Sequence, residues 1–370
     1  MLDPHVGEVN LFVLHLLSAL ASRLQTLPSS CRVTLLPSSA LEFTLAKNTG
    51  AYLANNKNHS NWETFEFRSL QLPAGSASVS VRAVDSWSAV KSADVVFFPG
   101  LMAFSHLCPL PTLRSAFTSL LQPLNSRPYP PLSWADDTEH KDSVYSIFHA
   151  HMLPATWVSL QGRTVYEVAE ELLRDKPDGQ YRLKGSYSMC GACGVTVKVT
   201  DGACPKMSEL LQHFVDHFHQ SDFGLQSFIP TFAQSELRFF TIAIPAAAPG
   251  TRFHKTGIIM KTSAKLDQEN KINKGIIFDT SVYAAVHPDS LACSLLVDQL
   301  QREYPDFFER IYSRGLHCLR FDMGYEPTLK FAFLNEFAAA PDAATWSAVH
   351  GQDLLWRVAD QTIENICNGL

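Results

Sequence analysis

The sequence predicts an α/β (α+β) protein built from two or three domains. A chain of 370 residues is too long for a single ordinary hydrophobic core. Its 46% hydrophobic and 18% charged residues are typical of a globular protein. Apolar residues recur along the chain with the periods of strands and of helices in alternation.

The first 130 residues predict an α/β domain. The run VNLFVLHLLSALASRL (9–24) has the apolar spacing of an amphipathic helix and lacks the basic start of a signal peptide. Short strands are expected at 31–37 and 77–84. The continuous apolar run SADVVFFPG (92–100) is typical of a central parallel strand. The many prolines of 105–133 indicate a linker or a domain boundary.

Beyond the prolines, helix and strand patterns alternate without an internal repeat. The expected elements are a helix in 136–152, a strand at 153–160, a helix at 164–175, a strand–loop–strand unit at 179–200, a helix at 207–218, two strands around a turn in 225–245, a basic turn-containing segment over 251–275, helices at 289–304 and 307–314, a hairpin at 316–337 and a closing helix at about 350–367.

Charge and composition exclude several classes of function. A net charge of −6 and a pI near 6.1 argue against nucleic-acid binding as the main function. No stretch reaches the roughly 20 apolar residues of a membrane span. The eight cysteines are scattered and form no disulfide framework, which favours reduced thiols. We expect a soluble cytoplasmic protein without nucleic-acid or membrane partners, and we leave a homodimer open.

The stretch YRLKGSYSMCGACGV (181–195) offers two competing sites. Cys190 and Cys193 have the C-x-x-C spacing of half a zinc site, but the remaining ligands of a zinc or iron–sulfur site are missing. Lys184 ends a strand pattern and precedes glycines and serines, whose backbone N–H groups can approach a phosphate closely. The loop is not a Walker A motif. We favour the phosphate site and interpret the cysteines as small loop residues.

A second lysine motif is DKPDG (175–179), which is similar to the K-x-D-G of nucleic-acid ligases. Lys176 would be the nucleophile in that interpretation. The motif lies in a Pro-Gly turn between a helix and a strand, and no later motif of that family follows. We therefore regard it as a turn.

The two strands of the predicted hairpin each carry a carboxylate, Asp322 and Glu336. A hairpin can bring both side chains to one metal ion. Magnesium prefers hard oxygen ligands, usually one or two carboxylates together with phosphate oxygens and waters. The pair therefore predicts a magnesium site.

The order of these features resembles the ATP-grasp superfamily, which includes D-alanine–D-alanine ligase and glutathione synthetase. The resemblance covers roughly residues 90–345 and rests on an ordered set: EHKDSVYSIF, LPATW, the Lys184 strand with its loop, LQSFIP with SELRFF, and RFDMG with LNEF. It implies two α+β subdomains, over 131–230 and 231–370, that sandwich a nucleotide.

The resemblance implies a set of ATP contacts. Two lysines would bind the phosphates, loop residues would close over them, hinge residues would hold the adenine, and a glutamate would lie on the E-x-R strand of the family. In that order, these residues are Lys141 and Lys184, then Ser186 and Ser188, then Gln226, Phe228 and Ile229, and then Glu236. Lys261 is the preferred further contact from the basic segment, with Lys255 as the second choice.

The resemblance also implies the catalytic and metal residues. Asp322 and Glu336 would hold Mg²⁺, as their spacing already indicates. Arg320 would face the transferred phosphate, and Arg238 belongs to the E-x-R strand. Together with Lys184, these arginines are the candidate catalytic residues.

Three positions depart from the family pattern. Ala338 replaces the asparagine of the usual E-x-N ending, and Gln226 stands where a glutamate often holds the nucleotide. Asn335 or Asp342 could compensate, but strand alternation places the side chain of Asn335 on the opposite face from Glu336. These departures keep open a weakened metal site or a protein that binds ATP without catalysis.

The resemblance implies an ATP- and Mg²⁺-dependent ligase. A substrate carboxylate would attack the γ-phosphate, and the acylphosphate would take an amine (or a thiol) to release phosphate, with small molecules such as amino acids or peptides as substrates. Positioning and charge neutralisation would do most of the catalytic work. The alternatives are a kinase on the same fold, which releases no free phosphate, and a non-catalytic nucleotide-binding or scaffold protein.

Overall fold

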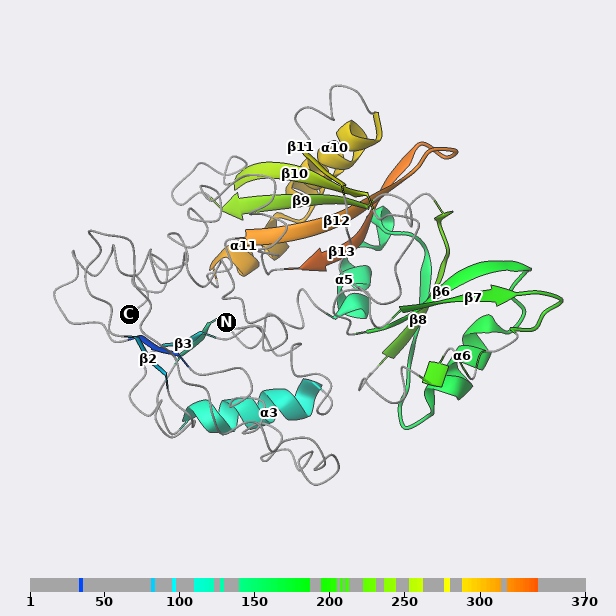
Figure 1. Ribbon diagram of the computed structural model, residues 1–370, viewed down its shortest axis with the longest axis horizontal. Helices are drawn as coiled ribbons and strands as arrows, with labels where there is room; N and C mark the ends of the chain where they lie inside the picture. The colour runs from blue at the N-terminus through cyan, green and yellow to red at the C-terminus, as the bar shows by residue number, and fades with distance from the viewer. Residues whose placement is uncertain are drawn as a thin grey trace. The chain divides into compact units, whose positions relative to one another are not determined.

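The structure is a computed structural model that describes residues 33–35, 81–83, 95–97, 110–122, 127–129, 140–186, 194–204, 207, 209, 211–212, 222–230, 236–243, 253–261, 276–279, 288–313 and 318–338. The chain divides into two compact units (Figure 1). The first unit comprises 1–132 and 342–370, and the second comprises 133–341. The helices predicted at 9–24 and 350–367 lie outside the described residues. The division into three domains stays a prediction.

In the first unit, two pairs of short parallel strands are described. β1 (Val33–Leu35) pairs with β2 (Val81–Ala83), and β3 (Val95–Phe97) pairs with β4 (Arg127–Tyr129). The parallel pairing of β3 agrees with its continuous apolar sequence. None of the described helices of the chain is long and apolar enough to cross a membrane.

The predicted linker over 105–133 is wrong in part, because it contains the helix α3 (Leu110–Leu121) as well as β4. Pro111 lies in the first turn of α3, where a backbone N–H has no partner within the helix, so the proline does not break it. Leu113 and Phe117, one helical turn apart, are completely buried. The burial of these two side chains stabilises a helix in a segment whose many prolines suggested a linker.

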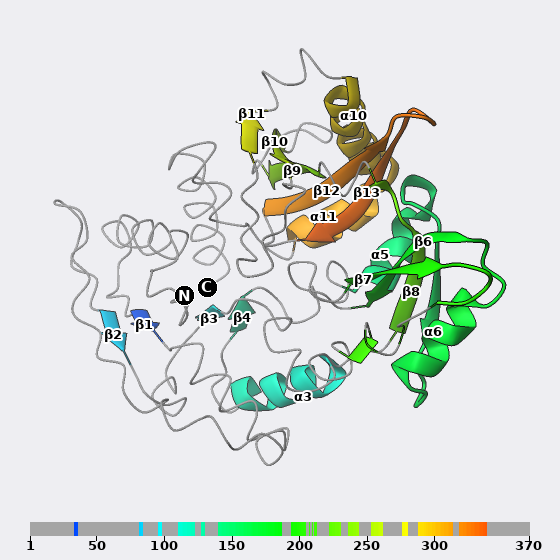
Figure 2. The ribbon, with the colours of Figure 1, turned by 45° about the vertical axis from the view of Figure 1, so that its right-hand side comes forward.

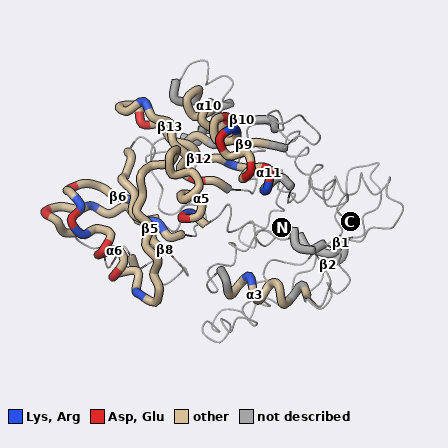
Figure 3. The backbone as a smooth tube through the Cα atoms, turned by 180° about the vertical axis from the view of Figure 1, so that it is seen from behind, with Lys and Arg blue, Asp and Glu red and all other residues tan. Residues whose placement is uncertain are grey.

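The second unit contains a four-stranded antiparallel sheet in the order β5-β8-β6-β7. These strands are β5 (Ala155–Ser159), β6 (Gly179–Gly185), β7 (Gly194–Val199) and β8 (Asp222–Ser227). One face of the sheet packs its apolar side chains against the helix α6 (Val165–Leu173). The opposite side of α6 is exposed and acidic (Figure 3).

The N-terminus of α6 is fixed by a capping box. The Thr164 hydroxyl accepts a hydrogen bond from the Glu167 N–H at 3.2 Å, and the Glu167 carboxylate accepts one from the Thr164 N–H at 2.7 Å. The pair satisfies two backbone donors that would otherwise have no partner within the helix. The helix therefore starts at a defined residue and holds its apolar side against the sheet.

The other face of this sheet carries a row of four residues, one from each strand. Trp157 pairs with Gly224, Gly224 with Lys184, and Lys184 with Gly194. Directly paired residues project to the same face, so the indole and the lysine flank a glycine. A Cβ atom at Gly224 would lie only 2.7 Å from the Trp157 ring atoms Cδ2 and Cε3. Gly224 thus provides the space that the indole occupies.

A five-stranded antiparallel sheet in the order β11-β10-β9-β12-β13 forms the rest of the second unit. Its strands are β9 (Glu236–Ala243), β10 (Phe253–Lys261), β11 (Ile276–Asp279), β12 (Cys318–Glu326) and β13 (Phe331–Ala338). The helix α10 (Pro288–Glu303) contacts β9, β12 and β13, and α11 (Pro305–Ser313) follows it (Figures 1 and 2).

The core of this sheet is rich in phenylalanine. Phe148 ends the helix α5 (Lys141–Phe148), which the short 3₁₀ helix η5 (His149–His151) follows. Its ring meets Phe307 edge-on, with 5.1 Å between ring centroids. Phe321 and Phe337, from the paired strands β12 and β13, are 5.0 Å apart in the same way. Such edge-to-face contacts add to the gain from area burial, so α5 is anchored to the five-stranded sheet.

The two strands expected in 225–245 are β8 and β9, and they belong to different sheets. The basic segment over 251–275 also contains a strand that the sequence analysis did not expect, β10, which lies between β9 and β11. The residues of FHKTGIIMK other than the lysines favour a strand.

We expect Gly224→Ala to destabilise the protein by about 1–3 kcal/mol, because the added methyl group overlaps the Trp157 ring. The measurement is the free energy of unfolding in urea. Gly179→Ala is the matched control on the same sheet, since its Cβ would meet nothing closer than 3.7 Å. Equal effects of the two substitutions would contradict the packing role of Gly224.

Candidate functional site

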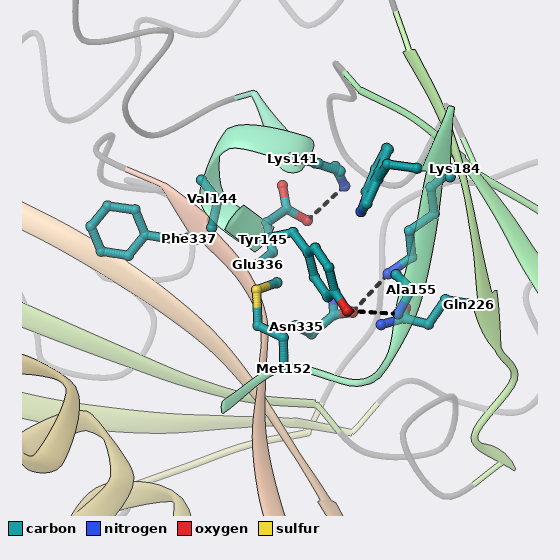
Figure 4. A pocket seen from close by; sticks show the side chains of 12 residues that line it. Lys141, Val144, Tyr145, Met152, Ala155, Lys184, Gln226, Asn335, Glu336 and Phe337 are labelled. Carbon is teal, nitrogen blue, oxygen red and sulfur yellow. Dashed lines mark hydrogen bonds and ion pairs between the residues drawn. The ribbon is translucent and has the colours of Figure 1, made fainter. Parts of the chain in front are cut away.

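A cavity open to solvent lies within the second unit and brings together Lys141, Lys184, Gln226 and Glu336 of the residues singled out in the sequence (Figure 4). Asp322 and Arg320 are not among its lining residues. It is lined by Lys141, Val144, Tyr145, Met152, Ala155, Trp157, Lys184, Gly224, Gln226, Asn335, Glu336 and Phe337. Side chains from α5, from the four-stranded sheet and from β13 thus meet at one place.

Lys141 is the first residue of α5, and its Nζ lies 3.4 Å from Oε2 of Glu336 on β13. Both side chains are largely buried, with 14% and 25% of their surfaces exposed. Partial burial reduces solvent screening, so the attraction is stronger than that of a surface pair. The pair holds the lysine at the wall of the cavity.

Lys184 comes from β6, and its Nζ donates a hydrogen bond of 2.9 Å to Oδ1 of Asn335 (Figure 4). An ammonium group has three donors. The contact with Asn335 uses one of these donors and does not neutralise the charge of Lys184. Lys184 lies where the sequence placed it, at the end of its strand, whose last residue is Gly185.

The expected orientation of Asn335 is wrong, and a β-bulge is the reason. Glu336 pairs with Asp322 and Leu334 with Met323, so Asn335 is an extra residue on β13. An extra residue interrupts the alternation of faces. Leu334 and Phe337 both belong to the apolar core, whereas Asn335 and Glu336 between them both line the cavity.

The two predicted metal carboxylates are directly paired across β12 and β13. Asp322 is 2% exposed, and its carboxylate is held by Arg320, with 2.9 Å from Nε to Oδ1 and 3.0 Å from Nη2 to Oδ2. Arg320 therefore faces the same side of the sheet as Asp322, as predicted from their spacing. Glu336 is the more accessible carboxylate of the two.

These oxygens fit magnesium better than zinc. Within the described residues, no group of three or more His, Cys, Asp and Glu side chains is arranged to hold a metal. A zinc site needs such a group. Magnesium is usually bound through one or two carboxylates, with phosphate oxygens and waters as its other ligands. Asp322 and Glu336 match that donor set.

The electrostatics of the cavity keep Glu336 ionised. Burial acts to raise the pKa of its carboxyl, but Lys141, Arg320 and Lys184 act against it, in decreasing order, and the hydrogen bond from Lys141 adds to them. The result is a pKa below the ordinary value of 4.5. A carboxylate is thus maintained among three cations.

Gln226 lies on the floor of the cavity and is 7% exposed. Its Nε2 donates to the carbonyl of Leu153 at 3.3 Å, which leaves Oε1 as the acceptor of the amide. The neighbouring hinge residues Phe228 and Ile229 do not line the cavity. The N–H of Phe228 already donates to the Gln180 carbonyl at 3.1 Å. Their predicted contact with adenine stays a prediction.

Other predicted contacts are less defined. Ser186 is fully buried and does not line the cavity. Ser188, like Cys190 and Cys193, lies outside the described residues. Glu236 and Arg238 are on β9, where Arg238 pairs in register with Asp322, and Lys255 and Lys261 are on β10. Their roles stay predictions.

Two cavity residues, Tyr145 and Trp157, were not singled out by the sequence analysis. Tyr145 follows Lys141 by one helical turn, and its hydroxyl accepts a hydrogen bond from the Ala155 N–H at 3.1 Å. Trp157 lies two residues after Ala155 on β5, and its Nε1 is buried without a hydrogen-bond partner among the described residues. Helical and strand periods were sufficient to find both.

The lowered pKa of Glu336 predicts a dependence of stability on pH. A carboxyl with a lower pKa in the folded than in the unfolded state stabilises the fold above its ordinary pKa of 4.5, and this contribution is lost as the pH falls through the folded value. Wild type should therefore melt above Glu336→Gln at pH 7, and the difference should shrink below about pH 4.5. Exposed Glu209→Gln is the control. A difference that grows on acidification would contradict the assignment.

Comparison with known proteins gives a likeness in structure only. No protein-family model and no curated sequence matches the chain. The D-alanine–D-alanine ligase of Helicobacter pylori has a TM-score of 0.43 and 12% identity, over 67% of this chain and 65% of the ligase. The chain thus spans slightly less than two thirds of that ligase. The D-alanyl-alanine synthetase A of Vibrio cholerae has a TM-score of 0.47 and 9% identity, over 90% of this chain and 100% of its own.

Biotin carboxylase from Campylobacter jejuni, solved as a β-γ-ATP complex, has a TM-score of 0.51 and 10% identity. The match covers 95% of this chain and 68% of the carboxylase. At this identity the likeness concerns the fold and not the reaction. The chain has the α+β fold of the ATP-grasp superfamily and resembles its members in structure.

Proposed function

We propose that the second unit binds Mg-ATP in this cavity and uses it to join a carboxylate to an amine. The observation that carries the proposal is that Lys141, Lys184 and Glu336 line one cavity, and that Glu336 is directly paired across the strands with the buried carboxylate of Asp322. Cations for phosphates and hard oxygens for magnesium are the two requirements of a phosphoryl-transfer site. The ATP-grasp fold supports the same reaction class by analogy.

The two lysines would bind the phosphates from different elements of the cavity. Lys184 has Asn335 as a neutral partner, so its charge is not compensated by that contact. Lys141 is paired with Glu336 and would share its donors between this carboxylate and a phosphate. Both groups are largely shielded from water, where charge stabilisation is most effective.

Asp322 and Glu336 would hold the magnesium ion, with phosphate oxygens as its remaining ligands. When bound, the ion neutralises charge that develops on the phosphate oxygens. Arg320 would fix the orientation of Asp322 through its two contacts. An orienting partner of this kind increases the precision of a ligand side chain.

The reaction would begin when a carboxylate oxygen of the substrate attacks the γ-phosphorus and the bond to ADP breaks. The acylphosphate would then be attacked by an amine nitrogen, with release of phosphate and loss of the amine proton to water. Since the lysines only position and neutralise charge, the gain would come from proximity and electrostatics. Amino acids and short peptides are the first carboxylates and amines to test.

A protein that binds the nucleotide without catalysis is the second candidate. Ala338 offers no oxygen at the position of the usual asparagine, and Asp322 is already engaged by Arg320. Against this, the bulge places the amide of Asn335 on the same cavity wall as Glu336. Product formation separates the two candidates.

Mg-ATP should raise the melting temperature of wild type, because a ligand that binds only the folded state stabilises it. At 100 times Kd the gain is about 2.7 kcal/mol. Lys184→Ala should lose most of the shift, since the phosphates lose a shielded cation. Lys198→Ala removes an exposed lysine of the same sheet and should keep the shift. An equal rise in melting temperature with Mg-ATP in Lys184→Ala and in wild type would contradict the proposal.

Asp322→Asn should lower ADP formation at least about 100-fold, because the amide removes a charged ligand of the metal. Amino acids are first screened with wild type for ADP release, and hydroxylamine is added to trap an acylphosphate as a hydroxamate. Asp178→Asn, at an exposed turn, is the control. ADP formation without a hydroxamate would favour the kinase. Wild-type binding of Mg-ATP without any ADP formation would favour the non-catalytic protein.

A further inference from the structure

A second polar cluster lies where α5, β6 and β8 meet. The sequence analysis named one of its members, Ser186, but did not predict the cluster. It consists of His140, Ser143, Ser186 and Asp222. His140 is the N-cap of α5, immediately before Lys141, and Ser186 follows Lys184 by two residues. The cluster therefore includes residues close in sequence to both cavity lysines.

The hydrogen bonds of His140 define its tautomer. Its Nδ1 accepts from the backbone N–H of Ser143 at 3.2 Å and lies 2.8 Å from the Ser143 hydroxyl. A backbone N–H can only donate, so Nδ1 carries no proton. The proton is on Nε2, which donates to Oδ2 of Asp222 at 3.0 Å. A neutral imidazole thus caps α5 with one nitrogen and binds β8 with the other.

Asp222 connects this cap to the strand that ends at the loop. Its backbone N–H donates to the Ser186 hydroxyl at 3.2 Å, and its carbonyl accepts from the Ser186 N–H at 3.0 Å. The carbonyl of Ser186 accepts from the Lys141 N–H at 2.9 Å. The chain of bonds closes on itself: His140, Asp222, Ser186 and Lys141. Ser186 is completely buried within it.

We infer that His140 and Asp222 are positioning residues for Mg-ATP binding. Their contact fixes the backbone at Lys141 and at Ser186 relative to one another, and so sets the separation of the phosphate-binding lysines Lys141 and Lys184. This inference rests on the proposed function. Neither residue touches the cavity itself, so the effect on the nucleotide acts through the lysines.

The experiment compares Mg-ATP affinity, by calorimetry at pH 8, in wild type and four variants. His140→Ala removes both contacts and should bind about tenfold more weakly, as loss of a cap and a connecting bond implies. His140→Asn keeps a good cap but is too short to reach Asp222, so it should also bind more weakly than wild type. Asp222→Asn should also weaken binding.

His149→Asn is the matched control, because it makes the same change at the exposed C-terminal end of the same helix. It should retain the affinity of wild type. If His140→Ala does not fold, His140→Asn and Asp222→Asn carry the comparison. Wild-type affinity in His140→Ala, or in both His140→Asn and Asp222→Asn, would overturn the inference.

The tautomer is tested without nucleotide. Imidazole ¹⁵N chemical shifts of the ligand-free protein should show the proton of His140 on Nε2, and a proton on Nδ1 would overturn the inference. If wild type itself does not bind Mg-ATP, the proposed function fails and the positioning role fails with it. If wild type binds Mg-ATP and the His140 variants bind it with the same affinity, the positioning role fails but the proposed function does not.

Discussion

The candidate site depends on the pairing of two lysines with two neighbouring residues of β13. Glu336 holds Lys141 from α5, and Asn335 holds Lys184 from β6. Two consecutive residues of a regular strand would face opposite sides of the sheet. The bulge at Asn335 removes this obstacle, and the phenylalanine core around Phe337 fixes the strand on its other side. A one-residue irregularity thus decides which groups share the cavity.

The charges on the described residues that line the cavity are unequal. Lys141 and Lys184 are positive, and Glu336 is negative. The whole chain carries a net charge of −6. A locally positive and partly desolvated site in an acidic protein attracts anions to one place and discourages them elsewhere. Asn335 contributes to this excess, because a neutral amide orients Lys184 without cancelling its charge.

Much of the fold and of the site could be predicted from the sequence, because the spacing of apolar residues along each element matches the face that the element buries. The hairpin with Asp322 and Glu336, the Lys184 strand and the helix with Lys141 are where their patterns placed them. Apolar alternation identifies such elements since each has one buried face.

The errors arose where non-local contacts decide. The bulge at Asn335 follows from the pairing of β13 with β12, which no period in LNEF records. The helix α3 forms despite Pro111, because Leu113 and Phe117 are buried. The hydrogen bonds that give His140 its tautomer come partly from Asp222, 82 residues away. Roles such as those of Arg238 and Lys261 still rest on the resemblance alone.

The bulge also limits how the gene for this chain can vary in length. Deletion of the codon for Asn335 or for Glu336 would change the pairing and exchange cavity residues for core residues. The turn of the same hairpin, where Leu329 is 75% exposed, has no such constraint. Insertions and deletions among descendants of this gene should therefore accumulate at the turn and be absent from the strands beside it.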